Sequence, residues 1–309
     1  MKINSILFPL VLCVCFSGFS QSTYLTTDSV FLSHKAYYNL EEAFAQADDV
    51  HHINLRQQEL SRIDERIGTL TKLEYANCMK NSIDSLPESI GELKDLKIIT
   101  FKQNHITYLP ASIGNLIALE ELCLEKNKIQ SLPASIGNLK QFNLLDLSVN
   151  KLSSLPSSIK KLKAISIIEL DNNDFSMFPV EITKCKKLEY LDISHNSFIV
   201  MPKEVSKLKH LKRLTISNCA LKTIESSFHK MKDLKTLDLS FNNLTELPAS
   251  IVKLQSVELL MLSYNQLTEL PEGLSELKNL KTITLVGNNF SEEEQQKIRA
   301  QLNSIDVRF

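Results

Sequence analysis

The chain has 309 residues and carries 35 lysines and arginines against 36 aspartates and glutamates, a formal net charge of −1 at pH 7. This balance excludes the strongly basic composition that nucleic-acid-binding proteins use to neutralise phosphates, so we expect no nucleic acid as a partner. No apolar run reaches the roughly 20 residues that a transmembrane helix requires, so we expect no transmembrane span.

Residues 1–20 are typical of a secretory signal peptide. Lys2 precedes an apolar run from Ile6 to Phe16, and the small residues Gly18 and Ser20 follow it. We therefore expect cleavage after about Ser20 and an exported protein, either periplasmic, on the cell surface or secreted.

Two cysteines in this region leave alternatives open. Cys13 and Cys15 are candidates for lipid attachment, but Leu12 and Val14 precede them where a bacterial lipidation motif has a small residue. A membrane-anchored lipoprotein is one alternative. A cytoplasmic protein is the other, if the first 20 residues are not a signal peptide.

The segment 21–49 is predicted to end in a capping helix. In the stretch NLEEAFAQADDV, residues 39–50, Asn39 and Glu42 are spaced as in a capping box. The apolar residues of the stretch fall on one helical face. They are Leu40, Ala43, Phe44 and Ala47.

Residues 50–290 consist of a repeated 23-residue unit with the template LxxLxLxxNxLxxLPxxIxxLxx. Eleven units follow one another without insertion or deletion, starting at 50, 73, 96, 119, 142, 165, 188, 211, 234, 257 and 280. A fixed period of this length is the signature of a solenoid. The leucines at positions 4 and 6 alternate with polar residues, which predicts one short strand per unit. No unit can bury its leucines alone, so stacking must form a parallel sheet over one continuous core.

Two further positions of the template have structural roles. The Asn at position 9 follows the strand, where its amide can satisfy backbone groups of its own loop and of the next. Gln58 and Cys219 replace it in the first and eighth units. The proline at position 15, as in Pro133, fixes φ on the return segment and lacks an N–H where none is needed.

The template resembles the leucine-rich repeat family, in its 23-residue form with the Leu-Pro pair. That form occurs in bacterial repeat proteins and in intracellular Ras-group proteins of plants and animals. The resemblance implies an α/β solenoid, a horseshoe of eleven units with a parallel concave sheet and helical caps at both ends. If the chain is not exported, the resemblance implies instead an intracellular signalling scaffold like the Ras-group proteins.

Residues 291–309 are predicted to form the C-terminal cap. Ser291 and Glu294 are spaced as a capping box, and Ile298 and Leu302 share a helical face. The last residues alternate as a closing strand would, with apolar side chains at Ile305, Val307 and Phe309.

The sequence offers no site for catalysis. Residues 171–174, DNND, lack the glycine and distal glutamate of a calcium loop, and no phosphate-binding or hydrolase motif occurs. We expect no enzyme, no cofactor and no metal. Cys78, Cys123, Cys185 and Cys219 fall in non-adjacent units, so we expect no disulfide between them. End caps stapled by disulfides are thus absent, as in a bacterial exported protein.

The concave face is the candidate binding surface. Positions 3 and 5 point outward from the sheet, position 8 lies at its rim, and units five to ten carry apolar groups beside acidic ones there. Apolar groups gathered on one surface mark interaction sites. The alternative is that aspartate is simply common at this position of the template and has no role in binding. The candidate residues are Tyr75, Leu144, Asp146, Ile167, Glu169, Tyr190, Asp192, His195, Asp238, Phe241, Leu259 and Tyr264. This predicts a monomeric, non-catalytic scaffold that binds an unknown protein.

A lysine flank is the second candidate surface. Position 20 is lysine in five consecutive units, and position 22 adds further lysines. Units five to nine hold 17 lysines and arginines against 12 acidic residues. One interpretation is that these lysines are only solvated surface residues without a ligand. The other is that they bind an anionic glycan or lipid headgroup. The residues at position 20 are Lys161, Lys184, Lys207, Lys230 and Lys253.

Overall fold

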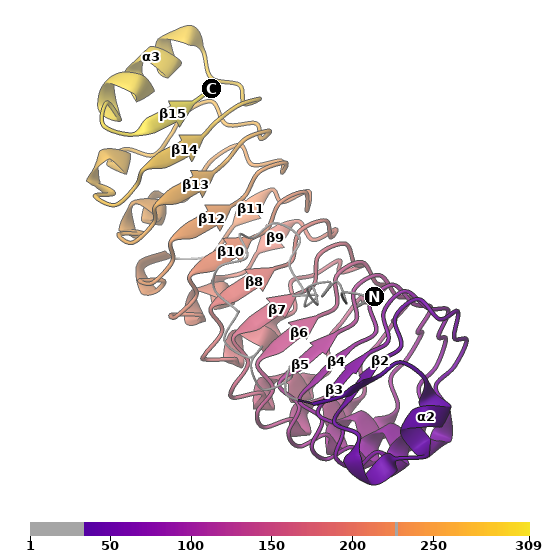
Figure 1. Ribbon diagram of the computed structural model, residues 1–309. Coiled ribbons are helices and arrows are strands. Elements are labelled where there is room, and N and C mark those ends of the chain that lie inside the picture. The colour runs from indigo at the N-terminus through magenta and orange to yellow at the C-terminus, as the bar shows by residue number, and fades with distance from the viewer. Residues whose placement is uncertain (1–33, 226–227) are drawn as a thin grey trace, which may run out of the picture.

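The computed structural model of the chain describes residues 34–225 and 228–309 and is an elongated solenoid in which each coil is one 23-residue unit (Figure 1). Its main sheet has thirteen parallel strands. Neighbouring repeat strands pair at the predicted offset, for example Leu122 with Leu145 and Leu145 with Ile168. The predicted leucine-rich repeat horseshoe is therefore confirmed. The expected signal peptide and residues 21–33 lie outside the described residues.

Each of the eleven units supplies one strand, formed by template positions 3 to 5. The strands are β2 (His52–Asn54), β3 (Tyr75–Asn77), β4 (Ile98–Thr100), β5 (Glu121–Cys123), β6 (Leu144–Asp146), β7 (Ile167–Glu169), β8 (Tyr190–Asp192), β10 (Arg213–Thr215), β12 (Thr236–Asp238), β13 (Leu259–Met261) and β14 (Thr282–Thr284).

The core lies between this sheet and the helices of the opposite side. Leu145 and Leu147, at positions 4 and 6 of one unit, are fully buried, and so are Ile168 and Leu170 in the next. Each fully buried leucine contributes about 1.5–3 kcal/mol to folding. One cluster of buried apolar side chains extends from Tyr37 to Leu302, so stacking replaces the globular core that a single unit cannot form.

The asparagine ladder ties each unit to its predecessor, as the sequence predicted. The Nδ2 group of Asn150 donates to the carbonyl oxygens of Leu124 and Leu147, both at 3.0 Å. Its Oδ1 accepts from the backbone N–H of Ile129 at 3.0 Å. In the eighth unit the buried thiol of Cys219 donates instead to the carbonyl of Ile193 at 3.3 Å.

The return segment of each of the first ten units is a 3₁₀-helix rather than an α-helix. Seven of these helices begin after a proline whose φ lies between −65° and −75°. The proline carbonyl then accepts the N–H three residues on, as between Pro133 and Ile136 at 3.1 Å. The 3₁₀-helices are η2 (Glu65–Thr69), η3 (Glu88–Glu92), η4 (Ala111–Asn115), η5 (Ala134–Asn138), η6 (Ser157–Lys161), η7 (Val180–Lys184), η8 (Lys203–Lys207), η9 (Phe228–Lys230), η10 (Ala249–Lys253) and η11 (Leu274–Glu276).

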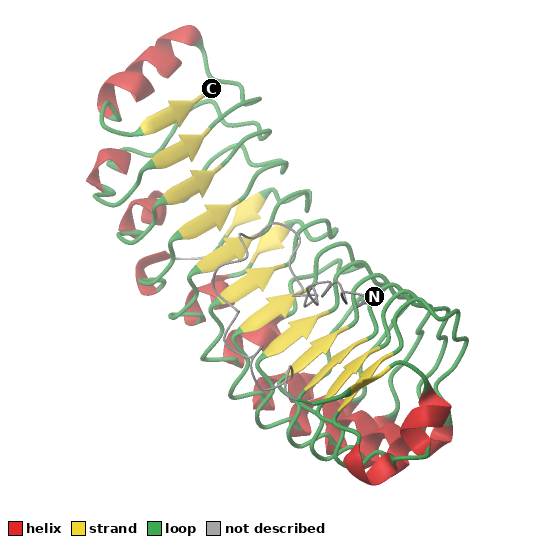
Figure 2. Ribbon diagram, viewed as in Figure 1, coloured by secondary structure: helices red, strands yellow, loops and turns green. Residues whose placement is uncertain are grey.

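The spacing of these helices changes along the solenoid. Glycine occupies position 19 in the first four units, and a Cβ added at Gly91 would lie 2.7 Å from the carbonyl oxygen of Ser112 in the next unit. Only glycine allows this approach. Lys160, Thr183 and Ser206 fill the position in the following units. Accordingly η2 to η6 pack closely, whereas η7, η8 and η9 contact one another less (Figure 2).

Helical caps close both ends, as predicted. In α2 (Leu40–Phe44) the Oδ1 of Asn39 accepts from the N–H of Glu41 at 2.7 Å. In α3 (Glu292–Gln301) the Oγ of Ser291 accepts from the N–H of Glu294 at 3.1 Å. The strand β15 (Asp306–Arg308) pairs with β14, whereas β1 (Ala36–Tyr37), which pairs with β2, and the short helix η1 (Ala47–Asp49) were not predicted.

A second sheet of two strands lies outside the main one and was not predicted. It pairs β9 (Val200–Met201) with β11 (Thr223–Ile224), from the seventh and eighth units. The eighth unit has Glu225 where most units have proline, and the backbone N–H of Glu225 donates to the carbonyl of Met201 at 2.9 Å, which a proline could not do.

The asparagine ladder gives a matched test of the fold. Asn173 donates to the carbonyls of Leu147 and Leu170, whereas Asn138 is exposed at the end of η5. Asn173→Asp places carboxylate oxygens against these carbonyls, so it should lower the free energy of unfolding by about 2–4 kcal/mol. Asn138→Asp, with the same change in charge, should leave it within about 0.5 kcal/mol. Urea denaturation measures both, and equal losses would contradict the ladder.

Candidate functional site

The concave surface is built by two parallel columns of outward-facing side chains. Position 3 and position 5 of each strand face the same side, and the fixed offset brings equivalent positions of neighbouring units together. Leu144, Ile167 and Tyr190 are therefore consecutive in one column. Asp146, Glu169 and Asp192 are consecutive in the other, as the sequence predicted.

The apolar column is partly withdrawn from the surface. Leu144 and Ile167 are 3% and 1% exposed, and they form a small cluster with Cys123 against Tyr190, separate from the main core. Both were expected to be exposed, and in this respect the expectation is wrong. Their side chains pack against one another across three neighbouring strands.

The acidic column has both a structural and an electrostatic role. The Oδ1 atoms of Asp146, Asp192 and Asp238 accept the backbone N–H two residues on at 3.0, 2.9 and 2.9 Å. This turn explains why aspartate recurs at position 5. Burial and the neighbouring Asp146 carboxylate raise the pKa of Glu169 to about 9. Burial likewise raises the pKa of Asp192 to about 6.

A lysine neutralises the N-terminal end of this column. Nζ of Lys102 lies 3.1 Å from Asp146 Oδ2 and 2.9 Å from Glu125 Oε2, with its side chain only 7% exposed. Although burial opposes its charge, these two carboxylates hold the pKa of Lys102 above its ordinary value. Glu169 forms no ion pair with a lysine among the described residues, and the more distant Lys102 only partly offsets the effect of burial on its pKa.

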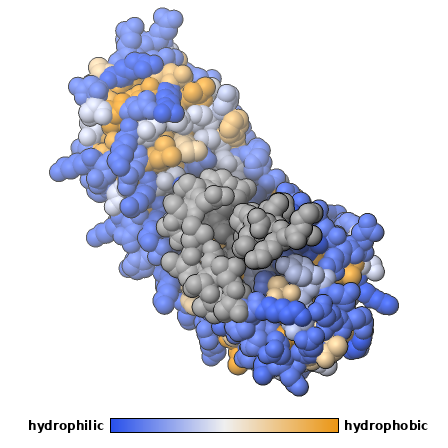
Figure 3. Space-filling model, in the orientation of Figure 1, coloured by the Kyte–Doolittle hydropathy of each residue, from blue (hydrophilic) through white to orange (hydrophobic). Residues whose placement is uncertain are grey.

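The C-terminal part of the concave face remains open. Phe241 and Tyr264 stack with ring centroids 4.4 Å apart and are 53% and 49% exposed. Both lie at position 8, where each of the first ten units has a left-handed backbone, with φ of 56° and 55° at these two residues. Half-buried Leu259 and Met261 follow on β13, and Figure 3 shows apolar side chains gathered over this end of the sheet. We call Phe241, Leu259, Met261, Tyr264 and exposed Val286 the C-terminal patch.

Two predicted residues lie apart from the patch. His195 is exposed at the rim, and its Nδ1 accepts from Asn218 Nδ2 at 2.7 Å. Tyr75 is buried near the N-terminal end, where its ring meets His52 edge-to-face at 4.6 Å. The structure therefore does not bring Tyr75 into one surface with Phe241 and Tyr264.

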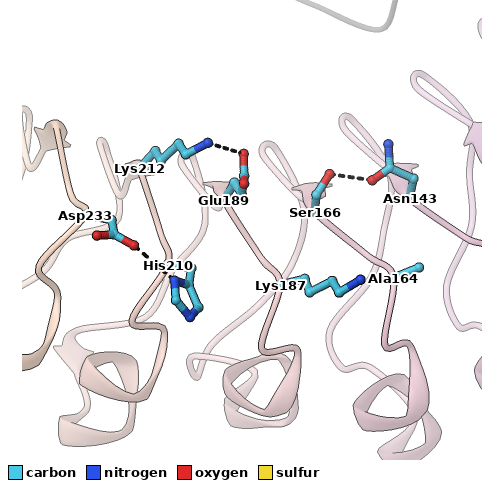
Figure 4. Close-up of a pocket in the computed structure, with 8 residues that line it drawn as sticks. All are labelled: Asn143, Ala164, Ser166, Lys187, Glu189, His210, Lys212 and Asp233. Atoms are coloured by element: carbon cyan, nitrogen blue, oxygen red, sulfur yellow. Dashed lines mark hydrogen bonds and ion pairs between the residues drawn. The ribbon is translucent and has the colours of Figure 1, made fainter.

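A hollow is lined by residues that immediately precede the strands of the concave sheet. Its volume is about 380 Å³, and Figure 4 shows its lining. Lys212 pairs with Glu189 at 2.7 Å and His210 with Asp233 at 3.0 Å. The lining residues are Asn143, Ala164, Ser166, Lys187, Glu189, His210, Lys212 and Asp233.

The predicted lysine flank adjoins this hollow. Each lysine at position 20 is the last residue of one helix, from η6 to η10, and all five are exposed. A second hollow of about 450 Å³ is lined by Lys209, His210, Lys230, Lys232 and Asp233. The two hollows share the His210–Asp233 pair.

A family model described as a leucine-rich repeat region matches residues 122–216 and 201–306, together more than half of the chain. The chain belongs to the leucine-rich repeat family. No curated protein matches it.

Solved leucine-rich repeat structures share this fold. A leucine-rich repeat protein of Leptospira interrogans is 26% identical, with a TM-score of 0.54, over 89% of this chain and 100% of that one. The plant peptide hormone receptor RGFR1 in complex with RGF2 is 27% identical, with a TM-score of 0.67, over 79% of this chain and 41% of the receptor. The functional domain of InlJ from Listeria monocytogenes is 20% identical, with a TM-score of 0.70, over 86% of this chain and 55% of that one.

Other kinds of site are not found in the described part of the leucine-rich repeat chain. Within residues 34–225 and 228–309, no three His, Cys, Asp or Glu side chains are arranged to hold a metal ion. Over the same ranges no helix has the length and apolar character needed to cross a bilayer. Cys78, Cys185 and Cys219 are free, so no two of the four repeat cysteines pair with each other.

Sequence reasoning missed the ion pairs between repeats, although a signal was present. Lys102 and Glu125 are 23 residues apart, and so are Glu189 and Lys212. A lysine and a glutamate separated by one repeat meet side by side on the solenoid. It also missed Met261 and Val286, which complete the C-terminal patch.

Because the pKa of Glu169 is raised, removing its carboxyl group is predicted to increase the stability of the fold by an amount that depends on pH. A carboxyl whose pKa is about 9 when folded and about 4.3 when unfolded stabilises the fold below pH 4, and this contribution is lost as pH rises towards 9. Glu169→Gln cannot ionise, so its melting temperature should exceed that of the wild type increasingly between about pH 4.5 and pH 9. Exposed Glu246→Gln is the control. A difference that does not change with pH would contradict the assigned pKa.

Proposed function

We propose that this leucine-rich repeat protein is an exported, non-catalytic scaffold that binds another protein on its concave face. The observation that carries the proposal is the C-terminal patch beside the acidic column. Its two stacked rings are about half exposed and lie beside half-buried Leu259 and Met261. Large apolar groups gathered on one exposed surface mark interaction sites.

The chemistry of this surface indicates the character of the partner. Aromatic side chains at the centre of an interface contribute most to affinity, and Phe241 and Tyr264 suit this role. Burial raises the pKa values of Glu169 and Asp192, and neighbouring carboxylates raise them further. A basic group of the partner placed beside them would stabilise their ionised forms. We infer a partner with an apolar segment next to lysine or arginine.

The solved relatives support the choice of a protein ligand. The plant receptor RGFR1, 27% identical to this chain, was solved in complex with RGF2 and is described as a peptide hormone receptor. The repeat arc alone covers 41% of that receptor, so its further parts have no counterpart in the comparison.

The binding surface is tested by removing the two rings. Phe241→Ala combined with Tyr264→Ala should weaken capture of the native partner in a pull-down by at least about tenfold, because hot-spot residues contribute about 2 kcal/mol or more each. The captured protein is identified by mass spectrometry and its affinity is then measured with purified components.

The control removes equally exposed apolar groups from another surface. Tyr108 and Met177 are 57% and 77% exposed at position 13 of their units, away from the sheet. Tyr108→Ala with Met177→Ala should bind the partner as the wild type does. Equal binding by both double variants would refute the C-terminal patch, and loss in both would indicate an effect on the fold.

Export is proposed on the pattern of residues 1–20 and has its own test. Mass spectrometry of the protein from its native cell should find an N-terminus near Gln21 in an exported fraction. Intact Met1 in the cytosol would favour the intracellular scaffold instead. An acyl group on Cys13 or Cys15 would favour the membrane-anchored lipoprotein.

A further inference from the structure

We propose that the lysine flank of units five to nine is a second binding site, separate from the concave face, and that its ligand is an acidic polysaccharide. Acidic and basic residues are segregated within these units. Asp146, Glu169 and Asp192 are on the concave side, while lysines end the helices of the return segments.

Part of the lysine excess has a structural explanation. At position 22 the side chain caps the preceding 3₁₀-helix, since Lys163 Nζ donates to the carbonyl of Lys160 at 3.0 Å and Lys186 Nζ to that of Thr183 at 3.2 Å. Gln255 does the same in the ninth unit. This capping needs a donor but no charge, so it does not account for a row of lysines.

The lysines at position 20 have no comparable structural role. Lys207 lies 3.5 Å from Glu204 on its own helix. Within the part of the chain that the structure describes, no carboxylate forms an ion pair with Lys184, Lys230 or Lys253. The row therefore keeps most of its positive charge available to a ligand.

The packing of the helices creates room beside these lysines. Where glycine at position 19 gives way to Thr183 and Ser206, the helices contact one another less, and the hollow of about 450 Å³ lies in this region. Lys209, Lys230 and Lys232 line it, with the His210–Asp233 pair on its wall. Its volume falls in the range of small-molecule sites.

Mutual repulsion makes the flank ready to accept an anion. Burial, followed by the neighbouring Lys184, Lys209 and Lys207, lowers the pKa of Lys186. Anionic groups placed between these lysines would remove the repulsion, and the gain falls as salt screens it.

A linear polymer fits this arrangement better than a membrane surface. The lysines recur once per unit in a row along the solenoid, so they match a chain whose charges repeat. The exposed large apolar side chains of the described residues include none at positions 20, 22 or 23 of units five to nine. The flank thus offers ammonium groups and hollows for sugar rings but no apolar group to insert into a bilayer.

The test compares a sulfated polymer with its uncharged parent on the full chain. Dextran sulfate should bind and dextran should not, and the affinity should fall at least about tenfold between about 50 mM and about 300 mM NaCl. Changing Lys209, Lys230 and Lys232 together to Glu should weaken binding of dextran sulfate by at least about tenfold. The same three positions changed to Gln should weaken it less.

A charge-matched variant separates the site from overall charge. Lys128, Lys151 and Lys222 are exposed on the opposite edge of the solenoid, and changing all three to Glu alters net charge equally. This variant should bind dextran sulfate as the wild type does, and melting curves should show that both variants fold. Equal loss in both, no binding of dextran sulfate, or binding only to phosphatidylglycerol vesicles or to inorganic phosphate would each overturn the proposal.

Discussion

The whole molecule depends on hydrogen bonds that join each repeat to the next at a fixed step of 23 residues. The strands pair at this step, and the asparagine ladder adds bonds at neighbouring offsets, such as Asn150 to Leu124 and Ile129. A single inserted residue would turn the leucines of one strand outward and misplace its asparagine. The unbroken period of the sequence is therefore a physical requirement, and it aligns every surface side chain in columns.

Those columns determine what the surface can do. A residue type repeated at one position becomes a stripe with a spacing of about 4.8 Å on the sheet and more on the helical side. Repeated acidic residues give a column in which burial and neighbouring carboxylates raise the pKa values of Glu169 and Asp192, and repeated lysine gives a positively charged flank. Two surfaces of opposite sign on one rigid arc can each select a different kind of ligand without interfering with the other.

The sequence was sufficient for the fold because its signals are periodic. Leu145, Asn150 and Pro156 occupy positions whose role follows from local chemistry, and stacking repeats that role in every unit. The exposure of Leu144 and Ile167 could not be predicted, because it depends on how side chains of several strands pack together. The contact of Lys102 with Asp146, two units away, likewise arises only from three-dimensional geometry.

The replacement of the ladder asparagine by Cys219 has a consequence for how the molecule folds. A thiol is a weaker donor than an amide and a poor acceptor, so the bond between the seventh and eighth units is weaker than its counterparts. The same units lack the close glycine contacts of the first four. In a linear array, stability propagates only between nearest neighbours. At this junction the pairing of β9 with β11 supplies additional backbone bonds between the same two units, so we expect the backbone, rather than the side-chain ladder, to couple them during unfolding.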